Sequence, residues 1–185
     1  MLDNKNPSVL YKLIDSFGNN HLWGFIYTKY IGGLNLRGSE KVLDFGSGSG
    51  AGSKHFAKVL SSGHLTCVDV SGYWMSICKK RLSKYGNVDY LLGRLPEFKL
   101  KADSYDVVNI HYVLHEVSKK MRAPTINEMY RILKKGGRIC IKEPQREGDG
   151  MPVSEIRGLM QKSGLSEVSA AEKNGTLEAI YVKTT

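Results

Sequence analysis

The sequence has few cysteines, and their number and spacing exclude two classes of protein. Only three cysteines occur among the 185 residues, and Cys67, Cys78 and Cys140 lie far apart along the chain. This odd, scattered set does not supply the pairs of a disulfide framework. It also lacks the close Cys/His spacing of a zinc site. We therefore expect small, buried thiols in a reducing compartment, and no bound metal.

Long apolar runs and repeats are also missing. No apolar run approaches the roughly 20 residues that a membrane-spanning helix needs. The residues from Met1 to Pro7 are polar and include Asp3, which is not typical of a signal peptide. From these two absences we expect a cytoplasmic protein without a membrane partner. Since no repeat, low-complexity tract or linker divides the chain, the sequence also predicts a single domain over residues 1–185.

Positive charge, by contrast, is abundant. The formal net charge is +9, and cations cluster in residues 79–84 and 134–142. Such clusters attract nucleic acid or acidic substrates. No basic run is interleaved with aromatic residues in the way that an RNA-binding platform requires. We therefore favour a solvated basic surface and keep a nucleic-acid partner as the alternative.

Strand-like apolar runs alternate with helical stretches along most of the chain. This order is typical of a parallel sheet with helices on both faces and right-handed crossovers. The predicted strands are Lys41–Phe45, His64–Val68, Asn87–Leu92, Tyr105–His111 and Arg138–Lys142. The predicted helices are Ala51–Leu60, Gly72–Tyr85, Leu114–Ser118 running into a loop, and Ala123–Leu133.

The C-terminal part departs from this alternation. A helix is predicted at Pro152–Ser163, and strands at Leu165–Glu172 and Thr176–Val182. Asn174-Gly175 between the two strands is a strong tight-turn signal. The sequence therefore predicts an α/β fold with a Rossmann-like, doubly wound, mostly parallel seven-stranded sheet and a C-terminal antiparallel hairpin.

Aromatic residues gather before the first predicted strand, between Pro7 and Leu36, in what reads as one or two amphipathic helices. We favour packing of this segment on the sheet edge. The alternative is a lid whose rings stack on a cation or a planar ligand. The residues concerned are Tyr11, Phe17, His21, Trp23, Phe25, Tyr27 and Tyr30.

The most informative segment is the glycine-rich turn that follows the strand Lys41–Phe45. Gly46, Gly48 and Gly50 allow a sharp turn and a close approach of the backbone to a ligand. Asp44 precedes them near the end of the strand, where a buried carboxylate needs a cation or a hydrogen-bond donor beside it. Asp69 ends the next strand, where a carboxylate can hold a ribose. A nucleotide-like ligand is the expected occupant, although nicotinamide-dependent enzymes use similar turns.

Four segments in this order resemble the motifs of class I S-adenosylmethionine-dependent methyltransferases. They are Asp44 to Gly50, Val68-Asp69-Val70-Ser71, Ser104 to Asn109, and Leu133 to Arg138, where Lys135 replaces the usual proline. The resemblance covers about Glu40 to the C-terminus. It divides the predicted domain into an N-terminal helical segment at 1–38 and a cofactor-binding core at 39–185.

The resemblance also implies roles toward S-adenosylmethionine, whose product is S-adenosylhomocysteine. Gly46, Ser47, Gly48 and Gly50 would pass close to the methionine and ribose parts. Asp44 would lie near the amino group, Asp69 would hold the ribose, and Val70 would lie against the adenine. Asn109 would border the methionine part. Gly93, Arg94 and Leu95 would border the adenine, although Arg94 stands where the family often has an acid.

The histidines after the fourth predicted strand suggest a proton acceptor near the substrate. His111 and His115 are four residues apart and would share a face if the segment were helical. We do not favour a metal site here, since the His-Glu-x-x-His order is absent. A general base is the stronger interpretation. Glu143, before Pro144, is a further candidate, and a solvated strand-end acid is its alternative.

These observations predict an enzyme that transfers a methyl group from S-adenosylmethionine to a small-molecule acceptor by in-line displacement. Alignment of nucleophile, methyl group and sulfur supplies most of the catalysis, and a base is needed only if the nucleophile carries a proton. A nicotinamide-dependent oxidoreductase and a non-catalytic cofactor-binding module of the same fold are the alternatives.

Overall fold

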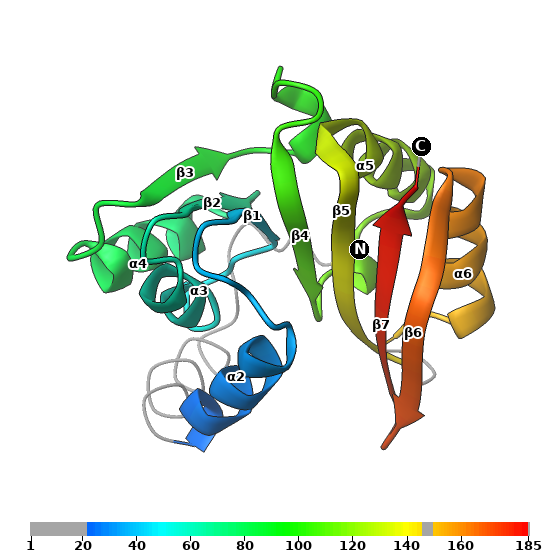
Figure 1. The fold of residues 1–185 in the computed structure, drawn as a ribbon, viewed down its shortest axis with the longest axis horizontal. Helices are drawn as coiled ribbons and strands as arrows, with labels where there is room; N and C mark the ends of the chain where they lie inside the picture. Colours follow the sequence, from blue (N-terminus) through cyan, green and yellow to red (C-terminus); the bar gives the residue numbers. More distant parts are fainter. Residues whose placement is uncertain (1–21, 146–149, 185) are drawn as a thin grey trace. The chain divides into compact units, whose positions relative to one another are not determined.

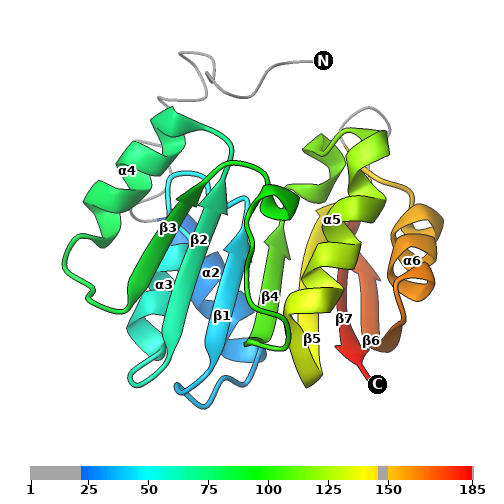
Figure 2. The same ribbon diagram turned by 90° about the horizontal axis from the view of Figure 1, so that it is seen from above.

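The computed structural model describes residues 22–145 and 150–184 of the chain. Within these residues, seven strands form one mixed sheet in the order β3-β2-β1-β4-β5-β7-β6 (Figures 1 and 2). The strands are β1 Lys41–Phe45, β2 His64–Asp69, β3 Val88–Leu92, β4 Tyr105–His111, β5 Leu133–Pro144, β6 Leu165–Lys173 and β7 Thr176–Lys183. The helices are α2 Leu22–Gly33, α3 Ser53–Val59, α4 Gly72–Leu82, α5 Lys119–Ile132 and α6 Val153–Lys162, with short 3-10 turns η1 Leu95–Glu97 and η2 Leu114–Glu116.

The predicted fold class is confirmed. Parallel pairs join β2 to β3, β1 to β4 and β4 to β5. The last two strands are antiparallel, β5 to β7 and β7 to β6. The predicted turn at Asn174-Gly175 joins the hairpin, and both residues have positive φ angles, 54° and 67°, as tight hairpin turns require.

Contacts divide the described chain into two compact units. The first holds the described residues up to Glu40 together with Gly46–Arg94, and the second holds Lys41–Phe45 and the described residues from Leu95 onward. The predicted single-domain organisation stays a prediction.

In the first unit, α3 packs on β2, and α4 packs on β3 and against α3 (Figure 1). The sequence of α4 explains its position, because Trp74, Met75, Cys78 and Leu82 are buried at helical spacing. Ser71 begins the helix by accepting a hydrogen bond from the N–H of Trp74 at 3.3 Å, an ordinary N-cap.

In the second unit, α5 and α6 pack against each other, α5 on β5 and α6 on β6 (Figure 2). Ile126, Met129 and Ile132 of α5 are fully buried and recur every three residues, so one face of the helix is apolar. Ile110 of β4 and Ile139 of β5, on the paired strands beside these helices, are also fully buried. This core fixes the ends of β4 and β5, from which the functional side chains of the unit extend.

Two of the predicted helices differ most from the structure. α5 begins at Lys119, four residues before the predicted start, and Pro124 lies inside it. The segment predicted as a helix at Leu114–Ser118 is the short 3-10 turn η2. Two side chains explain why this segment does not continue as an α-helix. Backbone N–H groups of the segment donate to Glu143, and its carbonyl groups accept from Arg122, so these groups are used outside the helical hydrogen-bond pattern.

Two of the described N-terminal aromatics differ from the predicted packing on the sheet edge, since one contacts a helix and the other is exposed. Tyr27 of α2 stacks on His55 of α3, with ring centroids 6.1 Å apart. Phe25 is 74% exposed and therefore does not pack on the sheet edge as predicted. Tyr11, Phe17 and His21 lie outside the described residues.

The predicted burial of the cysteines is confirmed, since Cys67, Cys78 and Cys140 are buried and free. Among the described helices, none combines the length and the apolar character that crossing a membrane would require.

Candidate functional site

The glycine-rich turn after β1 is held by the end of β2. The N–H groups of Gly46 and Ser47 both donate to the carbonyl of Val68, at 2.8 and 3.0 Å. Gly46, Gly48 and Gly50 have φ angles of 70°, 52° and 77°, in the left-handed region that favours glycine. The turn therefore depends on glycine at all three positions for its backbone conformation.

Gly48 and Gly50 nevertheless have different surroundings. A Cβ atom added to Gly48 would meet nothing within 4 Å, whereas one added to Gly50 would lie 2.7 Å from Leu82 Cδ1 and 2.8 Å from Cys78 Sγ. Gly48 thus leaves space for a ligand beside the backbone, and Gly50 allows the turn to pack on α4. The predicted approach of Gly50 to the cofactor stays a prediction, but its packing explains the glycine without a ligand.

Asp69, at the end of β2, binds the same turn. Its two carboxylate oxygens each accept a hydrogen bond of 2.8 Å, one from the N–H of Gly48 and one from the N–H of Ser71. Burial raises the pKa of Asp69, while the bonds from Ser71 and Gly48 lower it. Each oxygen retains a second lone pair, so the carboxylate can order the turn and still accept hydrogen bonds from a ligand.

Apolar side chains flank Asp69. Val70 follows it and is 46% exposed, and Leu92 at the end of β3 is 55% exposed. The N–H of Gly93 donates to the carbonyl of Asp69 at 2.9 Å, and Gly93 has a φ of 149°. Two exposed aliphatic side chains beside a carboxylate suit a flat ring joined to a polyhydroxyl group.

The other two residues predicted to border the adenine differ from each other. The side chain of Arg94 is exposed, so it is accessible at the end of β3. Leu95 is fully buried, so a ligand can meet it only through its backbone.

Arg81 of α4 is a residue that sequence reasoning missed. Its guanidinium donates from Nη1 to the carbonyl of Ser49 at 2.9 Å and to the hydroxyl of Ser49 at 2.6 Å. The sequence showed Arg81 only as one member of a basic cluster, and no local signal distinguishes it from the neighbouring lysines. Its function in the structure is to anchor the glycine-rich turn to α4.

The hydroxyl of Ser47 is an unsatisfied polar group in the glycine-rich turn. Its Oγ is buried and has no hydrogen-bond partner among the described residues. A buried hydroxyl normally finds a partner, so a ligand with a polar group near the turn would satisfy it.

In the second unit, Asp44 of β1 lies opposite Asn109 of β4 in the parallel register. Both are buried, and the side-chain amide of Asn109 donates to Oδ1 of Asp44 at 2.8 Å. The amide of Asn109 is thus a hydrogen-bond donor of the kind expected beside Asp44. The pairing holds two residues predicted to face the methionine part of the ligand.

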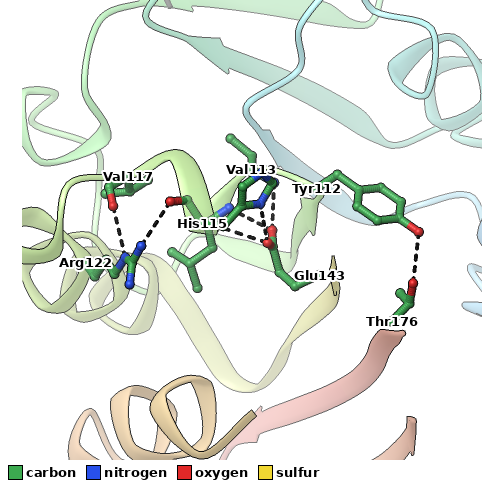
Figure 3. Close-up of polar contacts among 8 residues, drawn as sticks. Tyr112, Val113, His115, Val117, Arg122, Glu143 and Thr176 are labelled. Atoms are coloured by element: carbon green, nitrogen blue, oxygen red, sulfur yellow. Dashed lines mark hydrogen bonds and ion pairs between the residues drawn. The ribbon is translucent and has the colours of Figure 1, made fainter. Parts of the chain in front are cut away.

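A second polar cluster lies where β5 meets η2, around the fully buried carboxylate of Glu143. One oxygen of Glu143 accepts from the N–H groups of Val113 and Leu114, at 2.6 and 2.7 Å. The other lies 2.7 Å from Nδ1 of His115. Figure 3 shows the carboxylate facing the imidazole and the backbone of the turn. The expected alternative of a solvated acid is therefore wrong.

The pairing determines how His115 can act. An ionised carboxylate only accepts hydrogen bonds, so Nδ1 of His115 carries the proton and Nε2 is left as an acceptor. The side chain of His115 is 20% exposed, so its ring is not sealed inside the protein. The cluster thus presents a fixed proton acceptor at the end of the sheet.

Arg122 of α5 holds the same turn from its other side. Nη2 donates to the carbonyl of His115 at 2.9 Å, and Nε donates to the carbonyl of Val117 at 2.9 Å (Figure 3). Nη1 pairs with Glu155 of α6 at 2.6 Å. Arg122 therefore connects η2 to both helices of the unit, which sequence reasoning did not anticipate.

His111 is in a different environment from His115. It ends β4, as predicted, whereas His115 lies in η2, so the two histidines are not on one helix and the condition for a shared helical face is not met. Burial, followed by the charge of Lys142, lowers the pKa of His111 to about 3. Its ring meets that of Tyr112 edge-on, with centroids 4.7 Å apart.

Tyr112 connects β4 to η2 through an unusual backbone conformation. Its φ angle is 55°, which is uncommon for a bulky residue, and its N–H donates to the carbonyl of Lys142 at 2.8 Å. Its hydroxyl lies 3.4 Å from that of Thr176 on β7 (Figure 3). This conformation turns the chain from β4 into the segment that carries His115.

Comparison with known families agrees with this geometry. A family described as methyltransferase domain matches residues 43–141, which is more than half of the chain. The chain therefore belongs to the methyltransferase-domain family. This confirms the predicted membership among class I S-adenosylmethionine-dependent methyltransferases, and it does not favour the nicotinamide alternative.

Individual relatives are similar over part of their length. The ubiquinone/menaquinone biosynthesis C-methyltransferase UbiE of Vibrio campbellii is 30% identical over 111 residues, which cover 58% of this chain and 42% of the relative. The UbiE protein of Hydrogenovibrio crunogenus is 31% identical over 132 residues, covering 69% of this chain and 50% of the relative. The chain thus spans about half the length of these relatives.

A solved structure confirms the fold over nearly the whole chain. A SAM-dependent methyltransferase from Aquifex aeolicus has a TM-score of 0.79 at 19% identity, and the match covers 96% of this chain and 98% of that one.

Proposed function

We propose that this protein transfers a methyl group from S-adenosylmethionine to a carbon atom of a small, phenol-like acceptor. The observation that carries the proposal is the pairing of His115 with the buried carboxylate of Glu143, with Nδ1 of the imidazole 2.7 Å from the carboxylate. A positioned base has a purpose when the acceptor must lose a proton to become nucleophilic.

Several features of the first unit suit the methyl donor. The space beside Gly48, the buried hydroxyl of Ser47 and the exposed side chains of Val70 and Leu92 are available to a ligand. Asp69 would accept hydrogen bonds from the ribose hydroxyls. The predicted donor-binding residues of this unit also include Gly46, Gly50, Gly93 and Arg94.

In the second unit, the pair of Asp44 and Asn109 would meet the amino group of the donor. Leu95 would contribute only backbone groups. When bound, S-adenosylmethionine supplies a methyl group on a positively charged sulfur, which leaves as a neutral thioether.

The chemistry of His115 favours an acceptor with an acidic hydroxyl group. Nε2 would take the hydroxyl proton, while Nδ1–H stays bonded to Glu143, whose charge stabilises the imidazolium. The electron pair of the resulting phenolate forms the new bond between a ring carbon and the methyl group, and the proton on that carbon then leaves to water. The matched relatives from Vibrio campbellii and Hydrogenovibrio crunogenus are named as C-methyltransferases, which supports a carbon acceptor.

Both histidines were predicted as catalytic candidates, and we favour His115. A group with a pKa of about 3, as in His111, is too weak a base to take a proton efficiently near neutral pH. His111 is better suited to remain neutral beside Tyr112.

The proposal is tested by turnover. The protein is incubated with S-adenosylmethionine and with 1,4-naphthoquinol, 1,4-benzoquinol or catechol, and S-adenosylhomocysteine is measured by chromatography. We expect C-methylation of at least one quinol. His115→Asn should lower kcat by about 10²- to 10⁴-fold, with unchanged affinity for S-adenosylhomocysteine.

Three outcomes contradict the proposal in different ways. Binding of S-adenosylhomocysteine without turnover on any acceptor would indicate a non-catalytic module. Methylation at oxygen alone would remove the carbon acceptor. Full activity of His115→Asn would remove the base. The cytoplasmic location and the weaker case for a nucleic-acid acceptor stay predictions.

A further inference from the structure

The described helices of the first unit carry positive charge and no negative charge. α2, α3 and α4 contain lysine or arginine but neither aspartate nor glutamate. The described acids of this unit, Glu40, Asp69 and Asp89, lie outside these helices. Glu40 is buried, and Asp89 pairs with His64 at 2.8 Å. No acid on these helices therefore offsets their lysines.

Exposed apolar side chains lie among these cations on α2. Phe25 and Ile26 are 74% and 40% exposed. Lys29 follows them by four and three residues, so the three side chains are neighbours on one face of the helix. Ile31, on the opposite side, is buried. The exposed face of α2 is thus apolar with a cation at its edge.

The neighbouring helix α3 repeats this composition. Lys54 and Lys58 are exposed and four residues apart, and Val59 beside them is 43% exposed. α2 and α3 are in contact through Tyr27 and His55, whose rings stack, and through Thr28, whose hydroxyl lies 3.1 Å from Nδ1 of His55. Burial and the charges of Lys54 and Lys58 lower the pKa of His55. The positive charges of α3 therefore disfavour a further positive charge on His55, where α2 and α3 meet.

We propose that the exposed sides of α2 and α3, which carry Phe25, Ile26, Lys29, Lys54, Lys58 and Val59, bind the surface of an anionic phospholipid membrane. Lysines attract the negative headgroups, and the apolar side chains insert at the boundary with the acyl chains. Nucleic acid would use the lysines equally well, but it offers no apolar layer for Ile26 and Val59. Such peripheral binding requires no membrane-spanning helix and does not depend on the proposed methyl transfer.

Co-sedimentation with vesicles tests the proposal. The full chain is mixed with vesicles of phosphatidylcholine alone or of phosphatidylcholine with 30% phosphatidylglycerol, at low and high salt. We expect binding to the anionic vesicles that weakens with salt and little binding to the neutral ones. The double variant K54E/K58E should bind the anionic vesicles at least about 30-fold more weakly, because each lysine near the surface contributes about a fivefold factor.

Matched controls separate this surface from overall charge. The variant K99E/K101E makes the same change in net charge at exposed lysines of the second unit, and it should bind nearly as well as the unchanged protein. Phe25→Ser should weaken binding without changing its salt dependence. Equal loss in K54E/K58E and K99E/K101E, or no vesicle binding, would overturn the proposal. So would binding of a labelled RNA or DNA duplex that K54E/K58E abolishes and Phe25→Ser leaves unchanged.

Discussion

The carboxylate of Glu143 lies 2.7 Å from Nδ1 of His115 and also accepts hydrogen bonds from the N–H groups of Val113 and Leu114. One buried acid on β5 therefore fixes both the turn after β4 and the ring that the turn carries. One oxygen holds the turn and the other holds the imidazole, so a single side chain orients both, and rotation of the ring would break its bond to Glu143. A general base requires a ring held in one orientation with a lone pair on Nε2.

Replacing this acid tests the relationship. Glu143→Gln keeps the size of the side chain but places an N–H₂ group against donors. We expect kcat to fall about 10- to 100-fold, as when a supporting hydrogen bond to a functional histidine is lost, with little change in KM. The unfolding free energy should fall by about 1–3 kcal/mol, since buried N–H groups lose an acceptor. Steady-state kinetics and denaturant titration measure the two effects.

Glu178→Gln on β7 is the matched control. Glu178 is half exposed and pairs with Lys142, so its replacement should alter both quantities little. If Glu143→Gln lost stability and kept its full kcat, Glu143 would have a structural role alone.

The two glycines of the turn should respond differently to the same small change. Gly48→Ala adds a methyl group where nothing lies within 4 Å, so only the positive φ costs stability, about 1 kcal/mol. Affinity for S-adenosylhomocysteine should fall sharply, because the methyl group occupies the ligand's space. Gly50→Ala should lose about 2–4 kcal/mol of stability, because its positive φ and overpacking against Cys78 and Leu82 both contribute. Calorimetric titration and thermal unfolding of both variants provide the comparison, and equal cofactor affinity in Gly48→Ala and the unchanged protein would place the ligand elsewhere.

The sequence predicted the architecture because its signals are local. The strand Lys41–Phe45 is an apolar run that ends at glycines, and Asn174-Gly175 marks the hairpin through backbone chemistry alone. Asp69 was placed correctly at the end of a strand for the same reason. Its two hydrogen bonds to Gly48 and Ser71 follow from the turn that the glycines impose.

The remaining features depend on partners far away in the sequence. Glu143 reads as an ordinary strand-end acid until β5 is placed beside β4, which brings the amides of η2 to it. Arg81 looks like its lysine neighbours until α4 packs on the turn and its guanidinium reaches Ser49. Such long-range hydrogen bonds produce no periodic pattern of residue types along the chain, so a single sequence cannot reveal them.

Asp69 should matter for the donor more than for the fold. Asp69→Asn removes the charge but keeps the size, and we expect affinity for S-adenosylhomocysteine to fall by about 1.5–3 kcal/mol, the range for hydrogen bonds to a charged group. Asp89→Asn is the control, since Asp89 is exposed on β3 and pairs with His64. Calorimetric titration of both variants decides the matter, and an unchanged Kd in Asp69→Asn would show that this carboxylate does not hold the ribose.

His111 should make the protein less stable in acid. Burial lowers its pKa to about 3 in the folded protein, whereas the unfolded chain has the ordinary value of about 6.5. Below pH 6.5 the unfolded state therefore binds a proton that the folded state does not, and stability falls with pH by up to about 1.4 kcal/mol per unit. Between pH 7 and pH 5 the unchanged protein should lose about 2 kcal/mol more than His111→Gln, which cannot titrate. Denaturant titrations of both proteins across this range measure the difference, and parallel curves would show that His111 is protonated as readily in the folded protein as in the unfolded chain.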